Sequence, residues 1–324
     1  MTSFLRSASR GRLPGRALPA PAVPASPAPL TRRRTGAWRS ALVGALFTGP
    51  YLALLVAFGL MPAVYAIEQS VRNVDTGALS LENYTRVLTD FRFLPAVQHV
   101  AVFMVIWVPV MIGGTLLLAL LLHQRVGRLS GVLRLVYFLP GAVTGSAAVL
   151  LWYCMLAPNL SPFAPALRAL GMHSEVDVFT PGHLPWIFAL VAFITGTGQW
   201  IVVMYGALQA IPTEIMEAAA IDGAGPIRTA LQIKLPLIGK YVVFMFILAF
   251  AAALQIFIEP QLFYAITKSG SSWWSLNQLG YSFAFQLGDF AGAATISVLL
   301  LVFSTVAGLF LVYRTNFFDT GAVG

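Results

Sequence analysis

The sequence predicts an all-α membrane protein with six transmembrane helices. Hydrophobic residues make up 58% of the chain, and its mean hydropathy of +0.80 is far above that of a soluble domain. The apolar residues form six runs that are long enough to cross a membrane. Charged residues are only 10% of the chain, and the basic ones gather at the ends of these runs, which is typical of membrane orientation and not of a nucleic-acid face.

Residues 1–40 precede the first apolar run and predict a disordered cytoplasmic tail. They contain eight arginines, six prolines and no acidic residue, in an Ala/Pro-rich background that cannot bury a core. A cleaved signal peptide is the alternative, because three consecutive arginines at 32–34 precede the apolar run. The run Ala41–Ile67 is uncharged for 27 residues, which favours a retained first span.

Five further spans follow, and each reaches the roughly 20 residues that cross about 30 Å of hydrocarbon. Their expected bounds are Pro95–Leu122, Leu133–Ala157, Leu184–Leu208, Tyr241–Ile266 and Phe290–Tyr313. Six spans place both termini, including a short C-terminal tail at 319–324, on one side of the membrane. Fifteen Lys and Arg residues fall on that side and five on the other, so we expect both termini in the cytoplasm.

A polar stretch at 209–238 separates the fourth span from the fifth. Pro212 and Thr213 predict a helix start, with Thr213 as the N-cap residue. Gly223 and Gly225 predict the end of that helix, because glycine readily leaves the helical conformation. The stretch therefore predicts a first short helix followed by a sharp turn.

The rest of this stretch predicts a second short helix. Pro226 suits its first position, and Pro236 is expected to end it, since the residue before a proline is pushed out of the α region. The small side chains of Ala218–Ala220 in the first helix allow another surface to approach closely. We expect a helix–turn–helix displayed between two spans and shaped to fit a partner.

The same stretch resembles the cytoplasmic coupling loop of permease subunits in binding-protein-dependent ABC importers. The pattern E-A-A, three residues, G, nine residues, I-x-L-P fits without a gap at Glu217, Ala218, Ala219, Gly223, Ile233, Leu235 and Pro236. Asp222 belongs to an Ile-Asp-Gly-Ala version that is similar to the sugar-uptake branch, the relatives of the maltose and glycerol-phosphate permeases. The sequence departs from the family at Ala220, where a long polar residue is common, and at Ala230, where an aromatic residue is frequent.

This resemblance implies the ABC importer permease fold over residues 41–318, in the inner membrane of a prokaryotic cell. In such systems the loop docks into a cleft on an ATPase and transmits its closure to the membrane domain. The implied partners are a second, homologous permease subunit, two ATPase subunits, an extracellular solute-binding protein and membrane lipid. ATP and magnesium would be bound by the ATPase, and this chain would bind neither a cofactor nor nucleic acid.

Polar and aromatic residues inside the predicted spans are the candidates for a solute pathway, because polar groups in hydrocarbon usually face a bundle interior or a water-filled cavity. Gln255 and Glu259 are four residues apart in the fifth span, so a helix would place them on one face. The other candidates are Gln199, Trp200 and Tyr264. Hydrogen-bonding groups beside an aromatic plane suit a carbohydrate. The alternative is that these residues only pack and join helices.

No catalytic or metal-binding pattern is found. The chain has no Gly-x-x-x-x-Gly-Lys-Ser/Thr phosphate loop and no His-Glu-x-x-His, its one cysteine (Cys154) has no partner, and its four histidines lack metal-ligand spacing. The resemblance therefore implies a non-enzymatic permease subunit of an ATP-driven sugar importer. The alternatives are an ABC permease for another solute class and a secondary transporter driven by an ion gradient, with Glu259 as its ion site.

Overall fold

The computed structural model describes residues 37–73, 76–124, 128–143 and 145–315. The regular structure of these residues is helical apart from one isolated β-bridge, between Arg72 and Leu79. The chain divides into two units, Met1–Leu55 and Val56–Gly324. In the first unit the described residues form helix α1 (Ala37–Leu55). The rest of the predicted N-terminal tail and the predicted tail at 319–324 lie outside the described residues.

Among the described residues, five helical segments are long and apolar enough to cross a membrane. They are Val43–Ser70, Phe93–Gln124, Leu184–Gln209, Gly239–Thr267 and Phe290–Arg314. Each contains or closely overlaps one of the predicted spans, so the predicted all-α membrane fold is confirmed. The first of these segments includes a π-helical turn, η2 (Val56–Leu60), followed by α2 (Met61–Ser70).

The third predicted span, Leu133–Ala157, is not one straight helix. Helix α5 (Arg128–Phe138) continues as the 3-10 turn η3 (Leu139–Ala142), and α6 (Gly145–Leu156) then departs at an angle of 104°. Pro140 explains the change, because its ring removes a backbone donor from the helix. Counted as one broken span, the pair would raise the number of candidate crossings from five to six.

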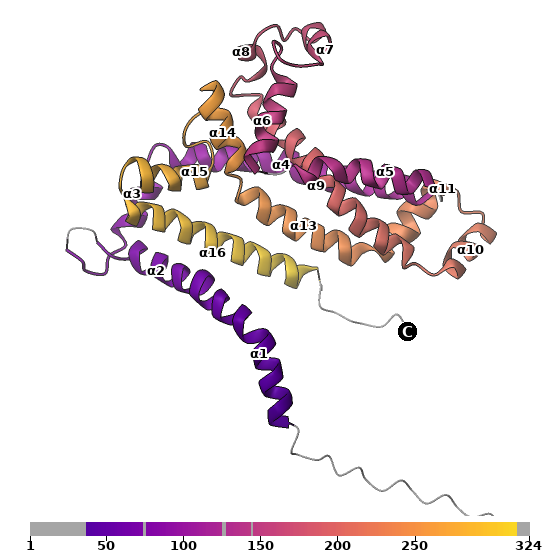
Figure 1. The fold of residues 1–324 in the computed structure, drawn as a ribbon, viewed down its shortest axis with the longest axis horizontal. Helices are drawn as coiled ribbons and strands as arrows, with labels where there is room; N and C mark the ends of the chain where they lie inside the picture. The colour runs from indigo at the N-terminus through magenta and orange to yellow at the C-terminus, as the bar shows by residue number, and fades with distance from the viewer. Residues whose placement is uncertain (1–36, 74–75, 125–127, 144, 316–324) are drawn as a thin grey trace, which may run out of the picture. The chain divides into compact units, whose positions relative to one another are not determined.

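Helices α4 (Phe93–Gln124) and α9 (Leu184–Gln209) run side by side through the second unit, with α13 (Gly239–Leu254) packed against both (Figure 1). Their facing side chains form the main buried core, which includes Phe103, Met111, Phe188, Met204 and Met245. Helix α9 also lies close to α5 and η3. A Cβ atom on Gly198 would strike the Tyr137 carbonyl, and one on Gly141 would come within 2.7 Å of the Thr195 carbonyl oxygen, so glycine is needed at both positions.

The short elements gather at the two ends of these long helices. Figure 1 shows α10 (Thr213–Ile221) and α11 (Pro226–Arg228) at one end, and α3 (Glu82–Leu88) and α15 (Leu276–Tyr281) at the other. The π-helical turn η5 (Ser282–Gln286) follows α15, and α16 (Phe290–Arg314) starts near α3 and packs against α2. The proline-rich stretch after α6 forms α7 (Ala164–Ala169) and α8 (Glu175–Val178), which lie near α14 (Ile258–Thr267).

Candidate functional site

The stretch between α9 and α13, at 210–238, forms two short helical limbs joined by a turn. The first limb is α10, and Pro212 occupies its N-cap position with extended backbone angles (φ −55°, ψ 139°). The prediction that Thr213 is the N-cap residue is therefore wrong. The ring of Pro212 holds φ near the value that it has here, so the helix starts directly after it, at Thr213.

The turn after α10 requires Gly223. Its φ of +71° lies in the left-handed region, which side chains with a Cβ disfavour, although no atom stands within 4 Å of the position a Cβ would take. The Gly223 amide donates to the Ala220 carbonyl at 3.1 Å, and the Ala224 amide donates to the Ala219 carbonyl at 2.9 Å. These two bonds form a Schellman motif, so the predicted helix break at this glycine is present.

The second limb runs from Pro226 to Leu237 through α11, the π-helical turn η4 (Thr229–Lys234) and α12 (Leu235–Leu237). Pro226 begins it, as predicted. Pro236 does not end it at the preceding residue, so that prediction is wrong. The wider π-helical turn ends at Lys234, two residues before Pro236, and an i→i+5 pattern leaves room for a ring that would otherwise strike the carbonyl four residues earlier.

Most of the predicted coupling residues lie on the surface of these limbs. Ala219 is buried, and two others are half-buried, Ile233 and Leu235. The remaining residues are exposed: Glu217, Ala218, Asp222, Gly223 and Pro236. Two large apolar side chains stand out at the turn, since Ile221 is 86% exposed and Ile227 is 75% exposed. Apolar side chains displayed among exposed carboxylates are typical of a surface that meets another protein.

A cavity of about 380 Å³ lies between α4, α9 and the segment that follows α13. Its lining consists of Phe103, Trp107, Ala192, Ala252 and residues 255–259. Gln255 and Glu259, two of the predicted pathway residues, both line it. The cavity is therefore the place in the structure where two of the predicted polar residues line one concave space.

The fifth predicted span is broken beside this cavity. Helix α13 ends at Leu254, Gln255–Phe257 are not helical, and α14 begins at Ile258. The expectation that Gln255 and Glu259 share the face of one continuous helix is therefore wrong, and the break brings them to the same cavity instead. Pro260 in the first turn of α14 is the sequence signal for this break, because proline is tolerated there but not in a helix interior. Non-helical backbone at membrane depth is tolerated where it lines a cavity.

Two aromatic residues of α4 complete the cavity wall and were missed by the sequence analysis. The rings of Phe103 and Trp107 stack with centroids 5.5 Å apart and planes 8° from parallel. The indole Nε1 of Trp107 is buried without a hydrogen-bond partner. Because this nitrogen has no exposed surface, Trp107 lines the cavity through its other atoms. The i,i+4 spacing of the two aromatics within an apolar run was the available signal.

The other predicted pathway residues lie elsewhere. Trp200 is buried in the core and meets Phe244 edge to face, with ring centroids 6.0 Å apart. Gln199 is exposed on α9. Tyr264 lies on α14, where the Lys268 ammonium stands 5.7 Å from its ring centroid. The structure thus brings two of the five candidates together, and three do not line the cavity.

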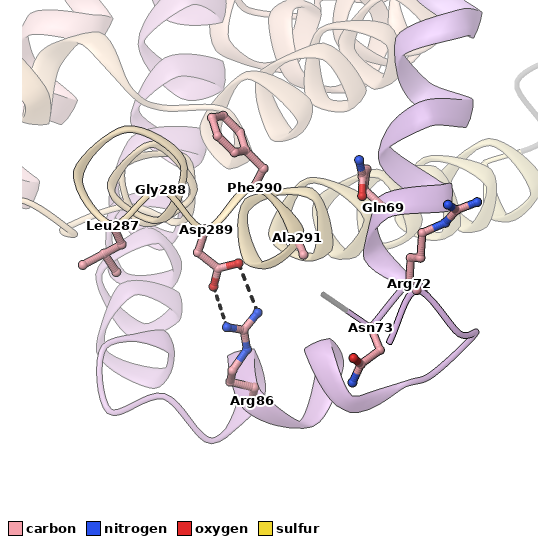
Figure 2. Close-up of a pocket in the computed structure, with 10 residues that line it drawn as sticks. Gln69, Arg72, Asn73, Arg86, Leu287, Gly288, Asp289, Phe290 and Ala291 are labelled. Carbon is pink, nitrogen blue, oxygen red and sulfur yellow. Dashed lines mark hydrogen bonds and ion pairs between the residues drawn. The ribbon is translucent and has the colours of Figure 1, made fainter. Parts of the chain in front are cut away.

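A second cavity, of about 530 Å³, lies at the α3 end and is polar (Figure 2). Gln69, Arg72 and Asn73 line one side of it, and Arg86 and Asp289 line the other. The Arg86 guanidinium meets both oxygens of Asp289, at 2.8 and 3.1 Å. Within the part of the chain that the structure describes, no group of three or more His, Cys, Asp or Glu side chains is placed to hold a metal ion.

Long apolar helices around a cavity that contains Gln255 and Glu259, with a break in one candidate span at that cavity, define a multi-pass membrane transport component. Residues 99–314, well over half of the chain, match the family model described as binding-protein-dependent transport system inner membrane component, and the chain belongs to this family. The family inferred from the loop pattern is thereby confirmed.

The names of three similar proteins state the solute that their transport system takes up. The chain is 31% identical over 213 residues to an sn-glycerol-3-phosphate transport system permease of Rhizobium meliloti, covering 62% of this chain and 70% of the relative. It is 28% identical over 292 residues to a diacetylchitobiose uptake system permease of Streptomyces coelicolor, covering 83% and 81%. It is 24% identical over 276 residues to an arabinooligosaccharides transport system permease of Halalkalibacterium halodurans, covering 84% and 87%.

Two solved structures share the fold. One is a bacterial ABC transporter involved in the import of the acidic polysaccharide alginate, with a TM-score of 0.74 and 16% identity over 87% of this chain and 97% of that chain. The other is a bacterial alginate ABC transporter in complex with alginate pentasaccharide-bound periplasmic protein, with a TM-score of 0.76 and 15% identity over 90% and 100%. The likeness confirms the predicted permease fold.

Proposed function

We propose that this chain forms one half of the translocation pathway of an ATP-driven carbohydrate importer. The observation that carries the solute class is the cavity at the break between α13 and α14. The aromatic pair Phe103 and Trp107 lines one space together with Gln255 and Glu259. Sugars offer hydroxyl groups and less polar ring faces, which such a set matches. The names of the relatives, two of which transport oligosaccharides, support the same class.

The proposed partner of the loop is an ATPase subunit. The exposed Ile221 and Ile227 provide apolar surface, and Glu217 and Asp222 lie exposed beside them, which supports docking into a cleft on another protein. Closure of two ATPase subunits would push on the 213–236 limbs and rotate the attached spans between inward-open and outward-open states. ATP and magnesium would be held by the ATPase, and this chain would receive only the mechanical step.

The proposed topology counts the bent pair of α5 and α6 as one span. Six crossings then place both termini on one side of the membrane, and the Lys and Arg bias assigns that side to the cytoplasm of a prokaryotic cell. The loop at 210–238 falls on the same side, facing the ATPase. The opposite end, which carries α3 and α15, would face an extracellular solute-binding protein, and a second, homologous permease subunit would complete the pathway.

The first experiment is a tagged purification from native membranes in mild detergent, with identification of the co-purifying chains and an ATPase assay. We expect an ATPase, a second permease and a solute-binding protein in the complex. Glu217→Ala should release the ATPase, whereas Glu68→Ala, which changes an exposed glutamate outside the 210–238 loop, should retain it. Recovery of this chain alone, with uptake driven by a proton or sodium gradient, would overturn the proposal in favour of a secondary transporter.

The solute class is tested by uptake into vesicles that contain the purified complex, its binding protein and ATP. The panel should include labelled disaccharides and oligosaccharides, glycerol 3-phosphate, amino acids, inorganic phosphate and a metal chelate. Selective uptake of a sugar or polyol derivative is the expected result. Selective uptake of an amino acid, phosphate or metal complex would keep the ABC permease and refute the carbohydrate assignment.

A further inference from the structure

Lys234 is a buried lysine on the second limb of the loop. Its side chain is almost fully covered, with 9% of the residue exposed. Burial lowers the pKa of the Lys234 ammonium, because the charged form loses its hydration. No carboxylate forms an ion pair with Lys234 among the described residues. A buried ammonium without a carboxylate needs another acceptor to be tolerated.

That acceptor is His123, 111 residues earlier in the chain and in the last turn of α4. The Lys234 Nζ lies 2.9 Å from the His123 Nδ1. An ammonium group can only donate, so the Nδ1 accepts and the imidazole is neutral, with its proton on Nε2. This hydrogen bond joins the second limb of the loop to the end of a central helix.

His123 is itself held by α9. Its ring hydrogen-bonds to the backbone of Leu208, and it meets the Tyr205 ring edge to face with centroids 6.0 Å apart. The Arg134 guanidinium covers the Tyr205 ring at 4.2 Å from its centroid. The contact between Lys234 and His123 therefore ends on a site braced by α5 and α9, so a displacement of Lys234 would be passed to packed helices and not absorbed by a loose side chain.

The two partners of this hydrogen bond lead to different parts of the cavity lining. The second limb passes directly into α13, which ends beside Gln255 and the break that carries Glu259. Helix α4 carries His123 at one end and Trp107 in the cavity wall, about 24 Å away at 1.5 Å per residue. The loop is thus joined to one wall by the chain itself, and to α4 both by the packing of α13 against that helix and by the hydrogen bond from Lys234 to His123.

We propose that the hydrogen bond between Lys234 and His123 is a positioning contact that fixes the end of α4 to the loop, so that this end of α4 moves with the loop in addition to the coupling that α13 packing provides. Lys234 occupies the variable x position of the Ile-x-Leu-Pro pattern, so its role is additional to that pattern. The inference rests on the proposed coupling of the loop to an ATPase. Without the contact, the loop would still move α13 and α14, but the end of α4 would follow the loop less closely, and less solute would be transported for each ATP hydrolysed.

The test measures solute uptake and ATP hydrolysis together, on the purified complex in vesicles. His123→Leu removes the acceptor and should raise the ATP hydrolysed per solute transported roughly tenfold, the factor expected for a lost hydrogen bond to a charged group. His123→Asn keeps an acceptor oxygen near the Nδ1 position and should restore most of the wild-type ratio. Lys234→Met keeps the apolar stem of the side chain but removes its charge. The double variant His123→Leu/Lys234→Met should hydrolyse no more ATP per solute transported than Lys234→Met alone.

Co-purification of the ATPase shows that each variant is assembled, and His173→Leu, an exposed histidine ahead of α8, is the matched control with an unchanged ratio. An unchanged ratio in assembled His123→Leu would overturn the inference and leave the proposed function intact. Equal loss in His123→Leu and His123→Asn would also overturn it, because the defect would then come from the imidazole ring and not from its acceptor. If the wild-type complex shows no ATP-driven uptake, the proposed function fails first and this inference fails with it.

Discussion

The guanidinium of Arg86 on α3 binds both carboxylate oxygens of Asp289, the residue that precedes α16. The two residues are 203 positions apart, so the pair joins a helix near the start of the described chain to one near its end. Asp289 has a second task, because its Oδ1 accepts the Gly292 amide at 2.9 Å and caps α16. One carboxylate therefore fixes both the start of a membrane helix and its attachment to α3, and Figure 2 shows its pair with Arg86.

Separating these two tasks gives the first prediction. Asp289→Asn keeps a cap acceptor but loses the ion pair, and because the Arg86 side chain is 47% exposed we expect a loss of stability below about 1 kcal/mol. Asp289→Ala also loses the helix cap, which adds about 1 kcal/mol to the loss of stability. In thermal unfolding of the purified complex, the wild type should have the highest unfolding temperature, Asp289→Asn a lower one and Asp289→Ala the lowest. Arg86→Gln is the control and should match Asp289→Asn; a match with Asp289→Ala would show that the cap contributes little.

The turn at Gly223 gives the second prediction. Gly223→Val forces a β-branched residue into a left-handed conformation, at a cost on the order of 1–3 kcal/mol, and should displace the two limbs of the loop. We expect ATP hydrolysis to persist while solute uptake falls at least tenfold. Gly225→Ala is a matched control, because Gly225 has φ −67° and free space where a Cβ would stand. Uptake in Gly223→Val equal to that in Gly225→Ala would contradict the proposed role of the turn.

The cavity gives the third prediction. Trp107→Phe keeps an aromatic ring but removes the larger indole that forms part of the cavity wall, so the apparent KM for the transported sugar should rise about five- to tenfold, which corresponds to about 1 kcal/mol of lost aromatic contact. The maximal rate should change less, because the loop and its contacts are untouched. Trp186→Phe is the matched control, since Trp186 is 62% exposed and does not line the cavity. A KM unchanged by Trp107→Phe would remove this indole from the solute pathway.

Patterns local in sequence predicted much of this structure. Apolar run length predicted the five long helical segments, and Gly223 with Pro226 predicted the turn and the second limb, because each signal acts within a few residues. Pro236 was misjudged, since a π-helical turn accommodates a proline that a regular helix would not. The position of the Phe103 and Trp107 pair opposite the broken span's Gln255, and the hydrogen bond from Lys234 to His123, depend on how distant helices pack. No local periodicity carries that information.

The link just before α4 gives the last prediction, which concerns pH. Arg92 donates to both oxygens of Asp90, at 2.9 and 2.8 Å, and its guanidinium lies 4.8 Å from the centroid of the Phe283 ring. Both side chains are mostly covered, with Asp90 17% and Arg92 14% exposed. The hydrogen bonds from Arg92 lower the pKa of Asp90, and partial burial opposes them more weakly. The carboxylate thus fixes the arginine against the aromatic ring.

Because the native pKa of Asp90 lies below its unfolded value of about 3.9, the pair stabilises the folded protein above about pH 4 and this contribution is lost as the pH falls through the native pKa. Asp90→Asn should therefore unfold at a lower temperature than wild type at pH 7. This difference in unfolding temperature should stay constant down to about pH 5 and become smaller below about pH 4. Thermal unfolding of both proteins in one detergent across this range measures it. Glu214→Gln, an exposed glutamate on α10, controls for the change in charge. A margin that stays constant into acid would mean that Asp90 acts through packing and not through its charge.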